Sequence, residues 1–251
     1  MDKFIIRGGI PLKGEITPSG NKNAALPLLA ATILTSEPVI LHNLPEINDV
    51  KTMRSLLESI GVEITHVKDH SWKFHAKEIR SSNLDAALCA EIRASVLLAG
   101  PMIARTGKVI LPPPGGDVIG RRRLDTHILA LEALGVKTNY QKKRNLFEFE
   151  TDQLAGREIL LDEASVTATE NAVMAAATAK GNTIIRNAAS EPHVQEVCHL
   201  LNILGAKISQ IGSNTLHIEG VSKLGGGEFT VGPDYLEVIS YVGAAVLTGG
   251  E

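Results

Sequence analysis

The chain has 251 residues, of which 44% are hydrophobic and 21% charged, and its formal net charge is −3. This length allows one or two domains with a sizeable core. The net charge argues against a general nucleic-acid binder, and an aromatic content of 4% leaves few rings for base stacking. The longest apolar run, residues 24–34, is too short to span a bilayer, and no secretory signal is recognisable. We expect a cytoplasmic protein without nucleic-acid or membrane partners.

The cysteines and histidines predict no metal or other cofactor. Cys89 and Cys198 lie in helix-like apolar patterns without a CxxC motif, which favours buried thiols in a reducing compartment. The eight histidines are scattered along the chain and lack metal-ligand spacing.

An internal repeat is predicted from three segments that end alike. Gly61, Gly135 and Gly205 each follow a helical apolar stripe and precede a strand-like stretch, about 70 residues apart. Glycine at that place is typical of a left-handed helix C-cap. In each copy a small-residue helix and a strand come before the stripe: residues 24–34 and 38–41, 94–104 and 108–111, and 172–179 and 182–186. In the first copy, Asn48 or Asp49 is the candidate cap of the second helix.

We assign residues 22–228 to one domain of three such copies. A fourth copy begins with a strand at 228–231 and a helix at 236–247, so residues 229–251 are read as the start of a second domain. Residues 1–21 form an N-terminal segment with strand-like sequence. This segment and a lone strand and helix cannot build a core, so a second chain or self-association is a candidate for completing the second domain.

A glycine-rich loop with three arginines is the strongest local signal for function. Gly115 and Gly116 precede Asp117, and Arg121, Arg122 and Arg123 follow before an apolar helical pattern. Glycines let a loop fold tightly over a ligand, and guanidinium groups at a helix start suit phosphate or carboxylate oxygens. The pattern predicts proton transfer on an anionic substrate. The alternative is a surface loop with solvated arginines.

Several motifs along the chain resemble the UDP-N-acetylglucosamine 1-carboxyvinyltransferase family of enolpyruvyl transferases. They are residues 14–27 with Lys22 and Asn23, and residues 92–95, 114–121, 160–169, 184–192, 216–221 and 224–227. The resemblance implies an α/β (α+β) fold, an inside-out α/β barrel of repeated βαβαββ units. Such proteins have two similar domains with the active site in the cleft between them. The resemblance also implies that the N-terminal segment, residues 1–21, belongs to the second domain.

The activity that the resemblance implies is enolpyruvyl transfer from phosphoenolpyruvate to the 3′-hydroxyl of UDP-N-acetylglucosamine. Phosphate is released, and the reaction is the first committed step of peptidoglycan synthesis. Such chemistry needs a proton donor for the vinyl carbon and cations around the donor's oxygens. Two alternatives stay open: a shikimate-pathway enolpyruvyl transferase, and a nucleotide-sugar-binding half-protein without catalysis.

The resemblance also implies roles for individual residues. Lys22 corresponds to the phosphoenolpyruvate lysine, with Asn23 beside it on the nucleotide sugar; the alternative for Lys22 is a solvated lysine at a helix start. Arg93 corresponds to a substrate-contacting arginine, or it forms an ion pair with a neighbour such as Glu91. Arg122 corresponds to a phosphate-binding arginine, and the run after it corresponds to the uridine-binding residues: Arg123, Leu124, Asp125 and Thr126. A second loop that contacts the nucleotide corresponds to Glu163, Ala164, Ser165 and Val166. The alternative for Ser165 is a helix cap.

Asp117 departs from many members of the family, which carry a cysteine general acid that fosfomycin alkylates. A carboxyl group can also donate a proton, although its reference pKa lies far below that of a thiol. Burial and a bound anion raise the pKa of a carboxyl group. We expect Asp117 to be the proton donor, with Lys22 as the other catalytic residue, and the protein to be insensitive to fosfomycin. Tyr235 stands where some relatives have a basic residue.

Overall fold

The computed structural model describes residues 3–116 and 123–251. Its helical elements, in chain order, are α1 (Lys22–Ala31), η1 (Thr32–Leu34), α2 (Asn48–Ser59), α3 (Ala86–Glu91), η2 (Arg93–Leu98), α4 (Ala99–Thr106), α5 (Asp125–Ala133), α6 (Val166–Ala176), α7 (Pro192–Ile203) and α8 (Tyr235–Thr248). Its strands are β1 (Val39–His42), β2 (Glu63–Lys68), β3 (Ser71–His75), β4 (Lys108–Leu111), β5 (Lys137–Gln141), β6 (Leu146–Glu150), β7 (Glu158–Leu160), β8 (Asn182–Arg186), β9 (Lys207–Ser209), β10 (Thr215–Glu219) and β11 (Gly227–Thr230).

Three sheets of one design confirm the internal repeat. Their strand orders are β11-β1-β3-β2, β4-β6-β5 and β7-β8-β10-β9. In each sheet the strand that follows a buried helix pairs antiparallel with the last strand of its own copy. On its opposite edge each of these strands has a parallel neighbour. β1 pairs with β11 and β8 pairs with β7, whereas Ile110 of β4 forms a single parallel bridge with Asn83.

The three predicted helix-ending glycines adopt the same left-handed cap. Gly61, Gly135 and Gly205 have φ of +105°, +97° and +102°. Each glycine N–H and the N–H of the following residue bond back to carbonyls of the last helical turn, as in Gly205 N to Asn202 O (3.0 Å) and Ala206 N to Leu201 O (2.9 Å). This is the Schellman arrangement, which needs a residue that tolerates positive φ.

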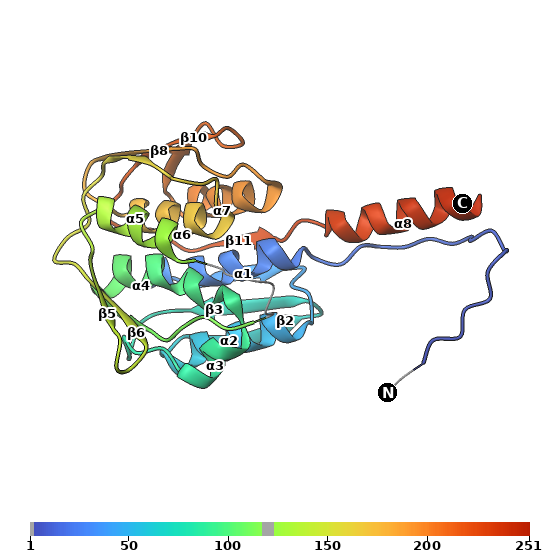
Figure 1. Ribbon diagram of the computed structural model, residues 1–251, viewed down its shortest axis with the longest axis horizontal. Coiled ribbons are helices and arrows are strands. Elements are labelled where there is room, and N and C mark those ends of the chain that lie inside the picture. Colours follow the sequence, from blue (N-terminus) through green and yellow to red (C-terminus); the bar gives the residue numbers. More distant parts are fainter. Residues whose placement is uncertain (1–2, 117–122) are drawn as a thin grey trace.

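The helices rich in small residues lie inside the molecule, with the sheets around them. Figure 1 shows α1 and α4 between the sheet that carries β8 and β10 and the sheet that carries β2 and β3. All residues of α1 from Ala24 to Ala31 are buried. At Gly100 in α4, a Cβ atom would lie 2.5 Å from the carbonyl oxygen of Asn171 in α6, so only glycine allows this approach. The arrangement agrees with the expected helices-inside fold.

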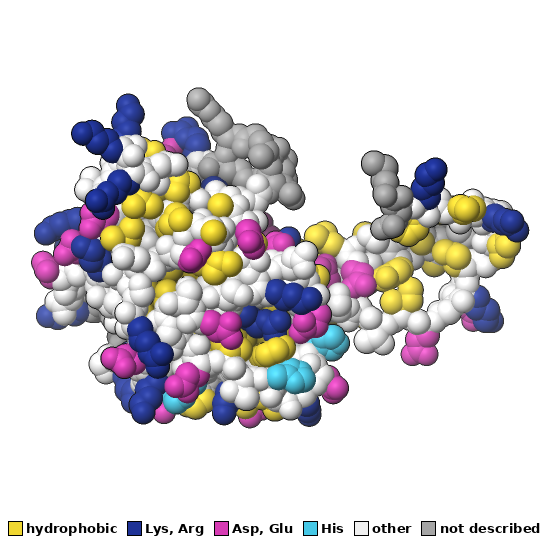
Figure 2. Space-filling model, turned by 90° about the horizontal axis from the view of Figure 1, so that it is seen from below, with side chains coloured by type: hydrophobic (Ala, Val, Ile, Leu, Met, Phe, Trp, Pro, Cys, Tyr) yellow, Lys and Arg dark blue, Asp and Glu magenta, His cyan; other side chains and the backbone are white. Residues whose placement is uncertain are grey.

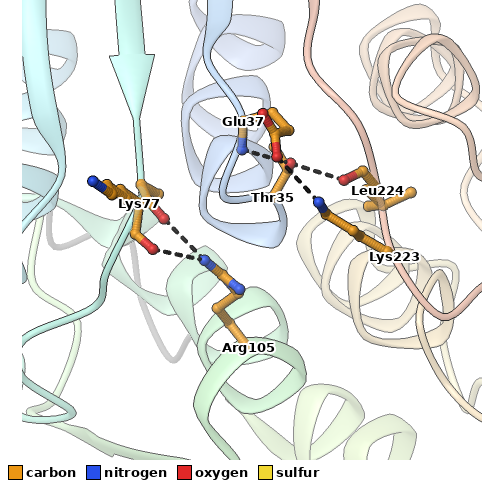
Figure 3. A network of polar contacts seen from close by, with 7 residues as sticks. Thr35, Glu37, Lys77, Arg105, Lys223 and Leu224 are labelled. Carbon is orange, nitrogen blue, oxygen red and sulfur yellow. Dashed lines mark hydrogen bonds and ion pairs between the residues drawn. The ribbon is translucent and has the colours of Figure 1, made fainter.

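Polar contacts link the first copy to the second and to the segment that follows the third. The guanidinium group of Arg105 donates hydrogen bonds to the carbonyl oxygens of Ala76 (3.0 Å) and Lys77 (3.3 Å), which links the second copy to the first (Figure 3). The hydroxyl group of Thr35 donates to the carbonyl oxygen of Leu224 at 3.0 Å, which links the first copy to the chain after the third (Figure 3).

Beyond residue 231 the chain leaves this body. Phe229 and Thr230, which the sequence prediction assigned to a second domain, pair with β1 in the first sheet. Residues 3–19 and α8 then extend away from the body side by side, and we call them the arm (Figure 1). They are joined by backbone bonds such as Glu251 N to Leu12 O (2.8 Å) and Asp234 N to Ser19 O (2.8 Å).

Much of the arm's surface is apolar, as Figure 2 shows. Phe4, Ile6 and Leu247 are each at least 87% exposed, and α8 has no buried residue. The strand expected in the N-terminal segment is absent from residues 3–19, because no neighbouring strand pairs with them. Among the described residues, no helix has the length and hydropathy needed to cross a membrane.

Candidate functional site

Five helical elements begin around one cleft of about 580 Å³. Its walls include Lys22 at the start of α1, Asp49 at the start of α2, Arg93 at the start of η2, Val166 at the start of α6 and His193 at the start of α7. The first turn of a helix carries a partial positive charge, even where a side chain caps some of its N–H groups, as in α1 and α6. Their convergence therefore favours an anionic ligand in this cleft.

Lys22 lies at the start of α1, as predicted, and its ammonium group faces Asp49. The two side chains form an ion pair of 2.6 Å and are 45% and 36% exposed. Asp49 thus pairs with Lys22, and the expected cap of α2 is wrong: the helix begins at Asn48 and the preceding Ile47 offers no side-chain acceptor. A half-exposed ion pair adds little stability, so an incoming anion can compete for Lys22.

Asn23 also lines the cleft, and its position is set by the preceding residue. The Oδ1 atom of Asn21 accepts hydrogen bonds from the backbone N–H groups of Asn23 (2.7 Å) and Ala24 (3.3 Å). This N-cap fixes the first turn of α1 and so directs both Lys22 and Asn23 toward the cleft.

Arg93 contacts both ends of the arginine-rich loop. Gly116, with φ of +83°, lies so close that a Cβ atom there would be 3.0 Å from the backbone nitrogen of Arg93. A Cβ atom at Gly115 would lie 1.7 Å from the carbonyl oxygen of Ala90, so a side chain is excluded there. On the far side of the loop, Arg93 Nη2 donates to the carbonyl oxygen of Arg123 at 3.3 Å. Asp117 and Arg122, together with Arg121, lie outside the described residues.

The two loops that were predicted to contact the nucleotide are joined to each other. The hydroxyl group of Thr126 donates to Asp162 Oδ1 at 2.6 Å, next to the loop at residues 163–165. Arg123 forms an ion pair with Asp125. The alternative role of Ser165 as a helix cap is confirmed, because its Oγ accepts from the N–H group of Ala168 at 3.4 Å.

The predicted residues divide into two groups by position. Lys22, Asn23, Arg93 and Val166 come together in the lining of the cleft. The others that are described lie outside that lining: Arg123, Leu124, Asp125, Thr126, Glu163, Ala164 and Ser165.

A buried histidine that sequence reasoning missed, His127, contacts the lining residue Thr167. His127 Nδ1 lies 3.0 Å from Asn171 Nδ2, and His127 Nε2 lies 3.0 Å from the hydroxyl oxygen of Thr167. The amide of Asn171 is oriented by Gly100 N, which donates to its Oδ1 at 2.7 Å, so Nδ2 is the donor to His127. Burial, with a smaller effect of the Arg93 charge, lowers the pKa of His127 to about 4. The neutral imidazole therefore donates from Nε2 to Thr167.

Glu170 in α6 lines the cleft and was also missed by sequence reasoning. It is 1% exposed, and its Oε1 atom has no hydrogen-bond partner among the described residues. Burial, followed by the charge of Glu191, raises the pKa of this carboxyl group well above its usual value. A lone acidic residue within the small-residue helix was the available sequence signal.

His193 connects the cleft to the arm. Its ring stacks on Tyr235 with centroids 6.4 Å apart, and the hydroxyl oxygen of Tyr235 lies 3.3 Å from His193 Nδ1. Burial lowers the pKa of His193, and Glu191 opposes this effect. Tyr235, whose consequence the sequence left open, therefore contacts a residue of the cleft from the first turn of α8.

The other titratable groups of note are the two thiols. Cys89 and Cys198 are both buried and unbridged, as predicted. Burial raises the pKa of Cys89 to about 11 and that of Cys198 to about 12, so both are protonated at neutral pH. Within residues 3–116 and 123–251, no group of three histidine, cysteine or acidic side chains is placed to hold a metal ion.

Solved structures of enolpyruvyl transferases have the same fold. The chain is similar to the enolpyruvyl transferase NikO from Streptomyces tendae, with a TM-score of 0.81 and 24% identity over 94% of this chain and 56% of that one. EPSP synthase from Acinetobacter baumannii is similar with a TM-score of 0.73 and 19% identity, over 93% and 53% of the two chains. The fold is therefore that of the enolpyruvyl transferases.

Sequence comparison identifies the family. Residues 6–251 match the family described as EPSP synthase (3-phosphoshikimate 1-carboxyvinyltransferase), and the chain belongs to it. A UDP-N-acetylglucosamine 1-carboxyvinyltransferase from Treponema denticola is 55% identical over 100% of this chain and 58% of its own length. The enzyme of that name from Bradyrhizobium diazoefficiens is 52% identical over 98% and 56%. The chain thus spans a little more than half the length of these relatives.

Proposed function

We propose that the protein acts in enolpyruvyl transfer from phosphoenolpyruvate to the 3′-hydroxyl of UDP-N-acetylglucosamine, with release of phosphate. The observation that carries this proposal is the cleft in which Lys22 and Asn23 of α1 meet Arg93 of η2, where five helical elements begin. Such a cleft suits a small ligand that carries both a phosphate and a carboxylate group.

The choice of acceptor rests on the relatives. Proteins named UDP-N-acetylglucosamine 1-carboxyvinyltransferase share 46–55% identity with this chain, whereas the EPSP synthase of A. baumannii shares 19%. A pocket that distinguishes a nucleotide sugar from a shikimate ring needs its own set of contacts. The higher identity therefore favours the nucleotide sugar as acceptor.

In the proposed mechanism the helix N-termini, Lys22 and Arg93 hold the oxygens of phosphoenolpyruvate. The sugar hydroxyl oxygen adds to the carbon that bears the phosphate and gives its own proton to water, while a proton from Asp117 goes to the methylene carbon, which becomes a methyl group. This methyl carbon then returns a proton to the carboxylate of Asp117, the double bond forms again, and phosphate leaves with the electron pair of its C–O bond. Cationic groups stabilise the phosphate as its bond breaks.

Two measurements on the same preparation test the proposal. Calorimetric titration with UDP-N-acetylglucosamine should give saturable binding, and phosphate release should require both substrates. Arg93→Ala should raise the phosphoenolpyruvate concentration that gives half-maximal phosphate release at least tenfold, which corresponds to roughly the strength of a charged hydrogen bond. Lys68→Ala, which removes an exposed lysine outside the cleft, is the matched control.

Each possible failure has a distinct meaning. Absence of UDP-N-acetylglucosamine binding would refute the proposed acceptor. Binding without phosphate release would contradict catalysis by this chain and leave a nucleotide-sugar-binding protein. Release that depends on shikimate 3-phosphate would assign the other acceptor.

A further inference from the structure

We infer that Asp49 is a resident counter-ion of Lys22 that competes with inorganic phosphate for this ammonium group and so promotes release of phosphate from the cleft. The inference rests on the proposed function in one respect, since inorganic phosphate is a product of the proposed reaction. It adds to the site a residue that the sequence motifs did not assign to it.

The competition follows from a direct contact between the two side chains. Lys22 Nζ lies 2.6 Å from Asp49 Oδ2, and both residues line the cleft. The side chains are 45% and 36% exposed, so an ion that enters the cleft can reach them. A phosphate group that binds the ammonium group of Lys22 must therefore take the place of the Asp49 carboxylate.

The helix positions of the two residues favour such an exchange of partners. Lys22 lies at the start of α1, where the partial positive charge of the helix end disfavours a further cation, so Lys22 needs an anionic partner from the protein or from a ligand. Asp49 lies in the first turn of α2, where the same kind of partial charge stabilises a carboxylate. Asp49 can thus release Lys22 and remain in a favourable environment.

Among the described acidic residues that line the cleft, Asp49 is the one that contacts Lys22. Glu91 Oε2 instead accepts a hydrogen bond from the hydroxyl group of Thr52 at 2.9 Å, and Glu170 is buried in α6. The exchange at Lys22 is therefore assigned to the carboxylate of Asp49.

The exchange weakens the binding of a ligand with one anionic group more than that of a ligand with two. Every anion that binds Lys22 must displace Asp49. A ligand that carries both a phosphate and a carboxylate group can also bind Arg93, which lines the cleft from η2, and this second contact offsets the displacement. Inorganic phosphate has no second anionic group. Competing contacts of this kind are a general source of specificity.

Titration with inorganic phosphate tests the competition directly. Binding is followed by phosphorus NMR at constant ionic strength, on the unchanged protein and on Asp49→Asn. We expect Asp49→Asn to bind phosphate about threefold to fivefold more tightly, the range that a half-exposed ion pair allows. A role of Asp49 in merely holding Lys22 in place predicts weaker binding instead. The substitution removes no helix cap, because the start of α2 has no side-chain capping bond.

The control is Glu148→Gln, which frees a lysine outside the cleft. Lys108 Nζ lies 2.8 Å from Glu148 Oε1, and the two side chains are 38% and 20% exposed. This pair joins β4 to β6 and is not part of the cleft lining. Glu148→Gln should change the phosphate affinity by less than about twofold. Equal tightening in Glu148→Gln and Asp49→Asn would reveal a general effect of net charge and would overturn the inference.

A double-mutant cycle shows whether Asp49 acts through Lys22. Lys22→Gln alone should weaken phosphate binding, because it removes the ammonium group. Adding Asp49→Asn to Lys22→Gln should then change the affinity by less than about twofold, since no ammonium group is left to exchange. If Asp49→Asn gives the same gain with and without Lys22, Asp49 acts on phosphate by repulsion alone and the exchange is refuted.

Two further results would overturn the inference. One is unchanged or weaker phosphate binding in Asp49→Asn, with a melting temperature showing that the variant is folded. The other is absence of phosphate binding in both the unchanged protein and Asp49→Asn. The proposed function fails separately, because absence of UDP-N-acetylglucosamine binding by the unchanged protein would refute it without altering the phosphate titrations.

Discussion

At the scale of single residues, the cleft combines charged groups with buried titratable groups. Lys22 and Arg93 supply positive charge, while burial lowers the pKa of His127 to about 4 and raises the pKa of Glu170. An ionised Glu170 would weaken the field that attracts an anion, and a protonated His127 would repel Arg93. Because burial opposes the charged form of both groups, it favours the positive character of the site.

The lowered pKa of His127 predicts a stability that depends on pH. Its folded pKa is about 4 against 6.5 for the free side chain, so between these values the unfolded chain binds more protons. Stability should then fall as pH decreases from 6.5 to 4, by about 3 kcal/mol at most from this group. Urea unfolding at pH 7 and pH 4.5 measures the change. His127→Gln should reduce this loss of stability between pH 7 and pH 4.5, whereas substitution of the exposed His66 should not. An equal pH response in all three proteins would contradict the assignment of the pH dependence to His127.

Asp117 is predicted to be the proton donor. Asp117→Asn should abolish phosphate release while UDP-N-acetylglucosamine affinity changes less than about threefold, because an amide keeps the size but cannot protonate the methylene carbon. Retained turnover would exclude this role.

The same position predicts resistance to fosfomycin, since the family resemblance implies a reactive thiol where this chain has the carboxyl group of Asp117. Intact-mass measurement after incubation with fosfomycin should show unmodified protein. The buried, protonated Cys89 and Cys198 serve as internal controls, because an adduct there would not bear on residue 117.

At the scale of elements, the parts that follow local rules were predictable and those that depend on packing were not. The glycine caps at residues 61, 135 and 205 and the strands β4 and β8 match the prediction, because left-handed caps and short apolar strands are local features. Asp49 was misassigned as a cap because its partner Lys22 lies on another helix. The N-terminal strand failed because a strand requires a neighbour.

The residues of the candidate site also divide into those that the sequence predicted and those that it did not. Lys22, Asn23, Arg93 and Val166 were found by resemblance of their motifs, and they do meet in one cleft. Glu170 and the support of Thr167 by His127 were missed. Their roles depend on the burial of α6 against neighbouring helices, which periodicity alone does not reveal.

The repeated helix cap makes a quantitative prediction. Gly205→Ala should cost about 1 kcal/mol, because alanine is disfavoured at a φ of +102° even though a Cβ atom there meets nothing within 4 Å. Gly225→Ala is the control: its Cβ atom would lie 3.6 Å from Leu204 O, an ordinary contact, without a positive φ. Chemical denaturation of both variants measures the difference. Equal stabilities would show that the left-handed backbone is not what requires glycine at this position.

At the scale of the whole molecule, the arm differs from the body. The body buries its apolar residues among three sheets, whereas Ile5, Ile239 and Val246 on the arm are at least 67% exposed. Exposed apolar surface of this kind usually marks a contact with another folded unit. The arm is also linked to the cleft through the stack of Tyr235 on His193.

The arm predicts self-association of the isolated chain. Sedimentation velocity should show an average mass that rises with protein concentration, because pairing of the arms removes apolar surface from water. Replacement of Ile239, Val246 and Leu247 by glutamine should restore a concentration-independent monomer. Matched replacement of three exposed polar residues of the body should leave the association unchanged, and a monomeric unchanged protein at all concentrations would contradict the prediction.

The return of β11 to β1 sets an order on folding during synthesis. Residues that meet at this junction, such as Asn43 and Val231, are 188 positions apart, whereas β7, β8, β10 and β9 are near neighbours in the chain. A nascent polypeptide can therefore finish its third sheet before the first one. Until residue 227 leaves the ribosome, β1 remains an open edge that other growing chains could join, and chaperone contact at this stage would protect it.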